Sequence, residues 1–251
     1  MTTIGRHVYS AGIIGLGVVE LTFGSFAEVW IPVSARLPGY PLLVWAIAGV
    51  LVVAGLAINW PRTAKVAALA LGALFALGML ATELVPALAR PAVWGEWQAL
   101  AESTAMALGG VLAYALSLGV ANSASLARIA RWAFGACLLV FGVSHFAYAK
   151  FTASLVPAWL PPSQMFWAYA TGLAQIAAGL AMLSGVQARL AAICLTAMYA
   201  IFGLLVHIPS VIAHPASHDD WAENAINLII TGAAWVLADS LADRRLPWER
   251  T

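Results

Sequence analysis

Long apolar runs alternate with short polar or proline-rich breaks along the whole chain. Windows of about 20 residues test for membrane spans, because a helix of that length crosses the hydrocarbon core of a bilayer. Eight predominantly apolar windows predict helices at 8–29, 41–59, 64–85, 98–119, 129–150, 164–184, 188–211 and 221–241. The start of the fifth helix depends on reading residues 121–128 as a loop.

The composition indicates the same class of protein. Of the 251 residues, 63% are hydrophobic and only 9% are charged, whereas a soluble domain carries about 25% charged residues. The chain is therefore predicted to be an all-α integral membrane protein that crosses the lipid bilayer eight times. Its formal net charge is +1 and its sequence has no basic patch interleaved with aromatic residues, so nucleic acid is not an expected partner.

Basic residues divide unequally between the two ends of the predicted helices. Nine lie on the side of the N-terminus: Arg6, Arg62, Lys65, Arg128, Arg131, Arg189, Arg244, Arg245 and Arg250. Three lie on the other side: Arg36, Arg90 and Lys150. Cytoplasmic loops are enriched in lysine and arginine, so we expect both termini in the cytoplasm and the helices in a bacterial inner membrane. The first helix is expected to be retained, because its apolar run contains Glu20 and lacks a cleavage site of small residues.

The two halves of the chain resemble each other at an offset of about 124 residues. Four landmark pairs recur at or next to this offset: Gly17 and Gly142, Pro32 and Pro157, Gly55 and Gly179, and Trp97 and Trp221. Each half holds four predicted helices, an even number, so the halves share one orientation and form a parallel repeat. We therefore expect two four-helix bundles, at residues 1–124 and 125–251.

Ionisable residues occupy matching positions in the two halves. Glu20 takes the place of His145, and Glu83 takes the place of His207, each near the outer end of its helix. An ionisable side chain inside a membrane is costly and marks a functional site, so these four are the candidate catalytic residues. The alternative is structural, with each side chain bonded to a neighbouring carbonyl group.

Four further polar residues lie on the last predicted helix of each half: Glu102, Glu223, Asn224 and Asn227. They reinforce the case for a functional site. The two carboxylates lie within the first turns of their helices, where a solvated carboxylate that favours the helix N-terminus is the commoner role.

The second half carries a string of motifs. They are His145-Phe146, a corner running Val156-Pro157-Ala158-Trp159-Leu160-Pro161, the pair Phe166-Trp167, and Gly172 followed by Gln175. This string resembles the DoxX-like membrane proteins, four-helix bundles with a His-Phe pair, a Val-Pro-x-x-Leu-Pro corner, an aromatic start to the second helix, and a glycine with a polar residue three positions on. The resemblance covers about 129–241 and includes Pro209 after His207. The first half matches in outline, with Glu20-Leu21 in place of His-Phe.

The resemblance implies a role in membrane redox chemistry or complex assembly, since members are similar to the quinone-reducing subunit of thiosulfate:quinone oxidoreductase. A quinone could enter from the lipid and exchange protons with His145, His207, Glu20 or Glu83. The candidate residues around its head group are Phe146, Trp159, Trp167 and Gln175. The electrons would come from a partner protein, because the sequence shows no flavin, haem or iron–sulfur motif.

A metal ion is the second candidate cofactor. His214, His218 and Asp219 lie close together in the last outer loop and supply the imidazole and carboxylate ligands that transition metals favour. The alternative is a solvated polar loop. A haem held between His145 and His207 is a further option, since haem iron takes histidine as an axial ligand.

Two other classes of function stay open beside the redox subunit. A non-enzymatic membrane assembly or partner-binding subunit is favoured by the lack of electron-carrier motifs. A small-solute or metal transporter would be built on a repeat of this kind, although its polar sites would be expected nearer the membrane midplane. Cys137 and Cys194 differ in depth and are interpreted as core residues.

Overall fold

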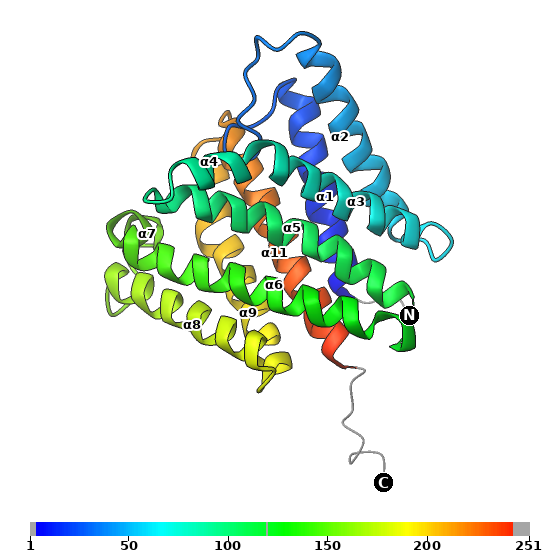
Figure 1. Ribbon diagram of the computed structural model, residues 1–251. Helices are drawn as coiled ribbons and strands as arrows, with labels where there is room; N and C mark the ends of the chain where they lie inside the picture. The colour runs from blue at the N-terminus through cyan, green and yellow to red at the C-terminus, as the bar shows by residue number, and fades with distance from the viewer. Residues whose placement is uncertain (1–3, 119, 243–251) are drawn as a thin grey trace.

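The computed structural model describes residues 4–118 and 120–242, and within these ranges the chain is helical and contains no strand (Figure 1). Arg244, Arg245 and Arg250, which contribute to the predicted orientation, lie outside the described residues. The helices are α1 (Ile4–Phe23), α2 (Tyr40–Ala57), α3 (Ala64–Thr82), α4 (Leu84–Ala89), α5 (Trp94–Ser117), α6 (Val120–Ala147), α7 (Ala149–Leu155), α8 (Gln164–Ser184), α9 (Ala188–Phe202), the π-helical turn η1 (Gly203–His207), α10 (Ile208–Ala213) and α11 (His218–Ala242).

Seven helical stretches in the described part of the chain are long and apolar enough to cross a membrane. They are Tyr40–Ala57, Ala64–Ala89, Trp94–Ser117, Ser123–Ala147, Gln164–Ser184, Ala188–Ala213 and His218–Ala242. The remaining long helix, α1, contains Arg6 and Glu20 and packs against both α2 and α11. The all-helical prediction is confirmed, and the chain is a multi-pass membrane protein.

Two helix boundaries differ from the prediction for clear reasons. Residues 121–128 are not a loop: α6 begins at Val120, because this polar stretch of alanine, serine and asparagine contains neither proline nor glycine to end a helix. Helix α1 ends at Phe23 instead of residue 29. Gly24 has a positive φ of 67°, and its N–H bonds to Glu20 O at 2.9 Å, which is a common way for glycine to close a helix.

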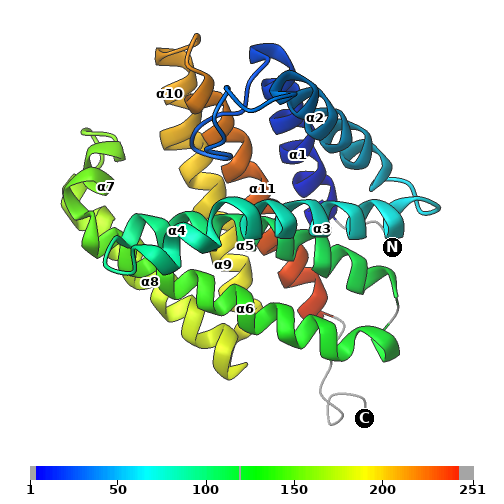
Figure 2. The same ribbon diagram turned by 45° about the horizontal axis from the view of Figure 1, so that its top comes forward.

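The helices form two layers that cross each other (Figures 1 and 2). One layer contains α2, α1, α11 and α9 in that order, and the other contains α8, α6, α5 and α3. The layers meet where α5 packs against α11. Each layer thus combines helices from both halves of the sequence, and the expected pair of self-contained bundles is not what the packing shows. Helices α5 and α11 consequently pack against each other in the middle of the molecule.

Four connecting segments lie on the side of the molecule away from the N-terminus (Figures 1 and 2). They comprise residues 24–39, 90–93, 148–163 and 214–217, and we call this side the distal face. The Tyr148 hydroxyl accepts from Gly95 N at 2.9 Å, and the Phe23 ring stacks on His218 with centroids 4.3 Å apart. These contacts tie the ends of α6 and α1 to the starts of α5 and α11, respectively.

Candidate functional site

The π turn η1 interrupts the helix that carries His207. Pro209 has no N–H, and its ring would clash with the carbonyl group of Leu205 in a regular α-helix. The wider turn relieves this clash, and the N–H of Ile208 bonds to Gly203 O, five residues earlier. Single π turns of this kind occur frequently at functional sites. His207 is the last residue of the turn, and its Nδ1 lies 4.0 Å from Glu223 Oε2 on α11.

A break at the matching place in the first half carries Glu83. Helix α3 ends at Thr82, four residues before Pro86, and α4 begins at Leu84. Glu83 is 6% exposed, and its Oε1 accepts from Thr82 Oγ1 at 3.1 Å. Both candidate residues on these helices therefore lie at an interruption that a following proline explains.

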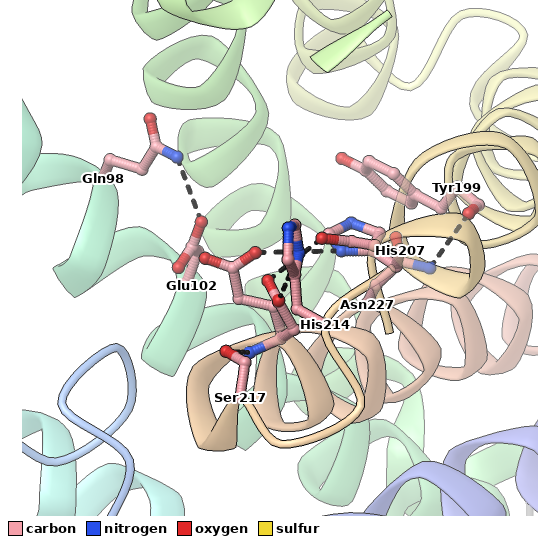
Figure 3. Close-up of polar contacts among 10 residues, drawn as sticks. Gln98, Glu102, Tyr199, His207, His214, Ser217 and Asn227 are labelled. Atoms are coloured by element: carbon pink, nitrogen blue, oxygen red, sulfur yellow. Dashed lines mark hydrogen bonds and ion pairs between the residues drawn. The ribbon is translucent and has the colours of Figure 1, made fainter. Parts of the chain in front are cut away.

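A group of polar side chains lies between α5, α11 and the α9–η1 segment (Figure 3). We call it the central polar cluster, and it consists of Gln98, Glu102, Tyr199, His207, Glu223 and Asn227. Gln98 Nε2 donates to Glu102 Oε1 at 3.1 Å, and Asn227 Nδ2 donates to Tyr199 O at 3.2 Å. A Cβ at Gly203 would lie 2.9 Å from Asn227 Nδ2, so the glycine of the π turn leaves space for this amide. Each of the three helical elements thus contributes polar side chains to the cluster.

The Tyr199 hydroxyl lacks a hydrogen-bond partner among the described residues, although the side chain is only 5% exposed. It lies within electrostatic range of the Glu102 carboxyl group and the Cys137 thiol. Its ring meets that of Phe202 edge to face, with centroids 5.9 Å apart. A buried hydroxyl usually finds a partner, so this group has unused hydrogen-bonding capacity inside the cluster.

The cluster continues to the distal face through Asp220. His214 Nδ1 lies 3.1 Å from Asp220 Oδ2, and Ser210 Oγ donates to Asp220 Oδ1 at 3.0 Å. Asp220 N in turn donates to Ser217 Oγ at 3.2 Å. These contacts join α10 to the first turn of α11, on the side where Glu223 is half exposed.

Glu20 contacts His218, a pairing that the sequence did not predict. Glu20 is fully buried; its Oε2 accepts from Ala27 N at 3.1 Å, and its Oε1 lies 3.5 Å from His218 Nε2. Ser25 Oγ lies 3.4 Å from the other ring nitrogen of His218.

The predicted metal ligands His214 and His218 fall into two separate contacts, with His214 beside Asp220 and His218 beside Glu20. The described residues contain no group of three or more His, Cys, Asp or Glu side chains placed to hold a metal ion.

His145 lies between α6 and α8 in a contact network of its own, which we call the His145 site: His145, Thr171, Gln175 and Phe202. His145 Nδ1 lies 3.1 Å from Ala168 O and 2.9 Å from Thr171 Oγ1. Its Nε2 lies 3.2 Å from Gln175 Nε2. If Nδ1 carries the proton and donates to Ala168 O, Nε2 is the acceptor for the Gln175 amide. The Phe202 ring covers the imidazole, with centroids 6.4 Å apart.

Gly172 brings the two helices of this site together. A Cβ at Gly172 would lie 2.7 Å from His145 Cβ and 3.0 Å from the Phe146 ring. Gln175 is 2% exposed, and its Oε1 has no hydrogen-bond partner within the part of the chain that the structure describes. The His145 site therefore has a buried oxygen atom, Gln175 Oε1, that can accept a hydrogen bond.

The four predicted head-group residues fall in two places. Gln175 contacts His145, and Phe146 lies next to it, stacked on Tyr169 with centroids 5.5 Å apart at the exposed surface of α6 and α8. Trp167 belongs to the proline corner, because its Nε1 donates to Pro161 O at 2.8 Å. Trp159 lies in the same corner and is 71% exposed. Of these four side chains, Gln175 belongs to the His145 site and Phe146 lies beside it, whereas those of Trp159 and Trp167 lie in the proline corner.

The matches to known proteins are confined to the second half. Residues 134–236 match a family model described as a domain of unknown function (DUF8561), which covers less than half of the chain. No curated protein and no solved structure matches the chain. The matched segment contains the whole His145 site and, from the central polar cluster, Tyr199, His207, Glu223 and Asn227.

Proposed function

We propose that the chain binds the head group of a quinone or quinol at the His145 site, as the membrane subunit of a redox complex whose electrons come from a partner protein. The observation that carries this proposal is the pairing of His145 Nε2 with the Gln175 amide at 3.2 Å, where Gln175 Oε1 is buried and has no partner within the described residues. An imidazole and an amide with unused hydrogen-bonding capacity, inside an apolar bundle, suit a ligand that carries carbonyl or hydroxyl oxygens.

The hydrogen-bond directions of the site fit both forms of such a ligand. The Gln175 amide nitrogen has two N–H groups, so one can bond to His145 and the other to a quinone oxygen. Gln175 Oε1 can accept from a quinol hydroxyl group. A quinone supplies the two-electron, two-proton couple when it is bound. In this scheme His145 Nε2 holds or releases the proton, and Thr171 and Ala168 fix the orientation of the imidazole.

The surroundings favour access from the lipid. Phe146 and Tyr169 form a stacked pair at the surface of α6 and α8, and Phe146 is 43% exposed. Aromatic rings at a polar site suit a flat head group. The DoxX-like resemblance of this half supports the same class of ligand, and the first half differs, because Glu20 contacts His218 and has no counterpart of Gln175 beside it.

We also propose that the chain crosses the membrane eight times as a parallel tandem repeat, with both termini in the cytoplasm. Matched contacts at the repeat offset support this proposal. Arg90 and Glu96 pair at 2.7 Å, as His214 and Asp220 do at 3.1 Å. Trp97 Nε1 donates to Pro91 O, and at the equivalent place Trp221 Nε1 donates to Pro215 O. Gly17 lies against Ala48, as Gly142 does against Gly172. Gly55 lies against Ile14, as Gly179 does against Leu139.

The repeat would differ from the expected one in how the halves meet. The first helix of each half packs against the last helix of the other half, α1 on α11 and α6 on α5. The His145 site draws only on α6, α8 and α9, so the proposal gives the chain one quinone site and leaves Glu20 and Glu83 outside it.

Quinone content tests the proposal. We expect quinone to copurify with the gently solubilised full chain and to fall several-fold in His145→Ala and in Gln175→Leu. His7→Ala is the matched control, because His7 lies near the start of α1, outside the His145 site. Its Nδ1 lies 2.6 Å from Asn59 Oδ1. Equal quinone content in all four proteins would overturn the proposal. It would favour the assembly subunit instead, in which His145 only fastens α6 to α8.

A further inference from the structure

The central polar cluster contains two carboxyl groups, and among the described residues the basic side chain that contacts them is His207, whose Nδ1 lies 4.0 Å from Glu223 Oε2. Glu102 on α5 and Glu223 on α11 lie within electrostatic range of each other, and Glu83 lies within range of Glu102. No lysine or arginine among the described residues lies within ion-pair distance of Glu102 or Glu223. Carboxylates at membrane depth are costly unless an opposite charge compensates them. A bound cation would therefore compensate carboxyl groups that no described lysine or arginine pairs with.

A second observation points to a ligand at the same place. The Tyr199 hydroxyl is buried, has no hydrogen-bond partner in the described part of the chain, and is directed toward the Glu102 side of the cluster (Figure 3). Both amides of the cluster donate through nitrogen, Gln98 to Glu102 and Asn227 to Tyr199 O. Their oxygen atoms therefore point away from these two contacts. The cluster offers oxygen acceptors from five side chains on three elements.

The chemistry of the cluster selects the kind of cation. The described residues hold no group of three or more His, Cys, Asp or Glu side chains arranged for a metal ion. The carboxylates come from separate helices, so a larger cation with several N–H donors fits them better than a bare ion does. The rings of Tyr199 and Phe202, 5.9 Å apart, add π faces that attract an ammonium group. Glu223 is half exposed and opens the cluster toward the distal face.

We infer that the central polar cluster binds a small protonated amine, with Glu102 and Glu223 as its counter-charges and the Tyr199 hydroxyl as an additional acceptor. The π turn contributes to this site, because Gly203 leaves room for Asn227 and His207 borders Glu223. The inference does not depend on the quinone proposal, since its counter-charges and the Tyr199 hydroxyl lie outside the His145 site and only the Phe202 ring borders both sites.

Calorimetric titration of the full chain in lipid nanodiscs tests this inference, with propylammonium chloride as the probe and sodium chloride at equal ionic strength as the reference. We expect saturable binding of propylammonium that is about tenfold weaker in Glu102→Gln and in Glu223→Gln, a loss typical of removing one charged partner. Tyr199→Phe keeps the ring and should weaken binding several-fold. Because it changes only one oxygen atom, it keeps the test valid if a glutamate variant fails to fold.

Glu96→Gln is the matched control. Glu96 lies on α5 two residues before Gln98, but it pairs with Arg90 at 2.7 Å on the distal face. This variant should bind propylammonium as the wild type does. Equal heats from sodium and propylammonium, or unchanged affinity in Glu102→Gln, Glu223→Gln and Tyr199→Phe, would overturn the inference.

Discussion

Pro209 lies two residues after His207, and the π turn that this proline imposes sets the direction of the histidine toward Glu223. One extra residue in a helical turn rotates everything after it by about 100° relative to a regular helix. The 4.0 Å approach of His207 Nδ1 to Glu223 Oε2 thus depends on the proline that follows the π turn.

Pro209→Ala should remove the reason for the π turn. We expect the helix to regularise and His207 to rotate away from Glu223, which a short bifunctional thiol reagent can measure between His207→Cys and Glu223→Cys. Crosslinking should fall several-fold when Pro209→Ala is added. Pro215→Ala is the control, because this proline lies outside the helix and contributes only its carbonyl group to Trp221. Crosslinking that persists in the Pro209→Ala background would show that the turn has another cause.

Gly142→Ala should destabilise the protein by separating α6 from α8. A Cβ at this position would lie 2.5 Å from Ile176 Cγ1 and 2.7 Å from Gly172 O, so the helices must move apart. Overpacking of this kind costs about 1–3 kcal/mol, measured as the free energy of unfolding in detergent. Gly78→Ala is the contrasting control, because nothing lies within 4 Å of its added methyl group. That change should stabilise α3 by up to about 1 kcal/mol. Equal effects of the two substitutions would contradict the close contact.

His218→Ala should remove the one basic side chain that lies beside the buried Glu20 carboxyl group among the described residues, since Glu20 Oε1 has no hydrogen-bond partner and lies 3.5 Å from His218 Nε2. Loss of a partner from a buried polar group costs about 1–3 kcal/mol, and the lost stacking on Phe23 adds to this. A double-mutant cycle with Glu20→Gln measures the coupling, and we expect the two changes together to cost less than the sum of the single changes. His214→Ala serves as the exposed counterpart, since its side chain is 66% exposed and its contact with Asp220 should contribute less than about 1 kcal/mol. Strict additivity would argue against the Glu20–His218 contact.

The apolar pattern of the sequence predicts the helices well, because the bilayer sets their length. Helix α8 has the predicted limits of 164–184, and most other ends differ by a few residues. The pattern fails at residues 121–128, where low hydropathy marks a polar helix start instead of a loop. Eight membrane crossings and a parallel repeat stay predictions. The exchange of helices between the halves has no signal in hydropathy, because it depends on which apolar faces meet.

The sites are harder to predict because they depend on register and on distant contacts. Glu20 and His218 are far apart in sequence, and no local spacing relates them. Tyr199 precedes His207 by eight residues, which places the two about 80° apart on a regular helix. The π turn reduces this difference to about 20°, and periodicity alone does not reveal such a turn. Thr171 and Gln175, four residues apart on α8, share a face as helical spacing requires.

The two-layer packing also bears on how the protein is made. Helix α1 is synthesised well before its main neighbour α11, because most of the described chain lies between them. At a translation rate of about 5–20 residues per second, the interval between them is roughly 10–40 s. During that interval α1, which carries Arg6 and Glu20, is without its main neighbour. Insertion machinery or a chaperone that shields α1 until α11 is made would therefore act early in synthesis, and removal of α11 would expose α1 more than any other helix.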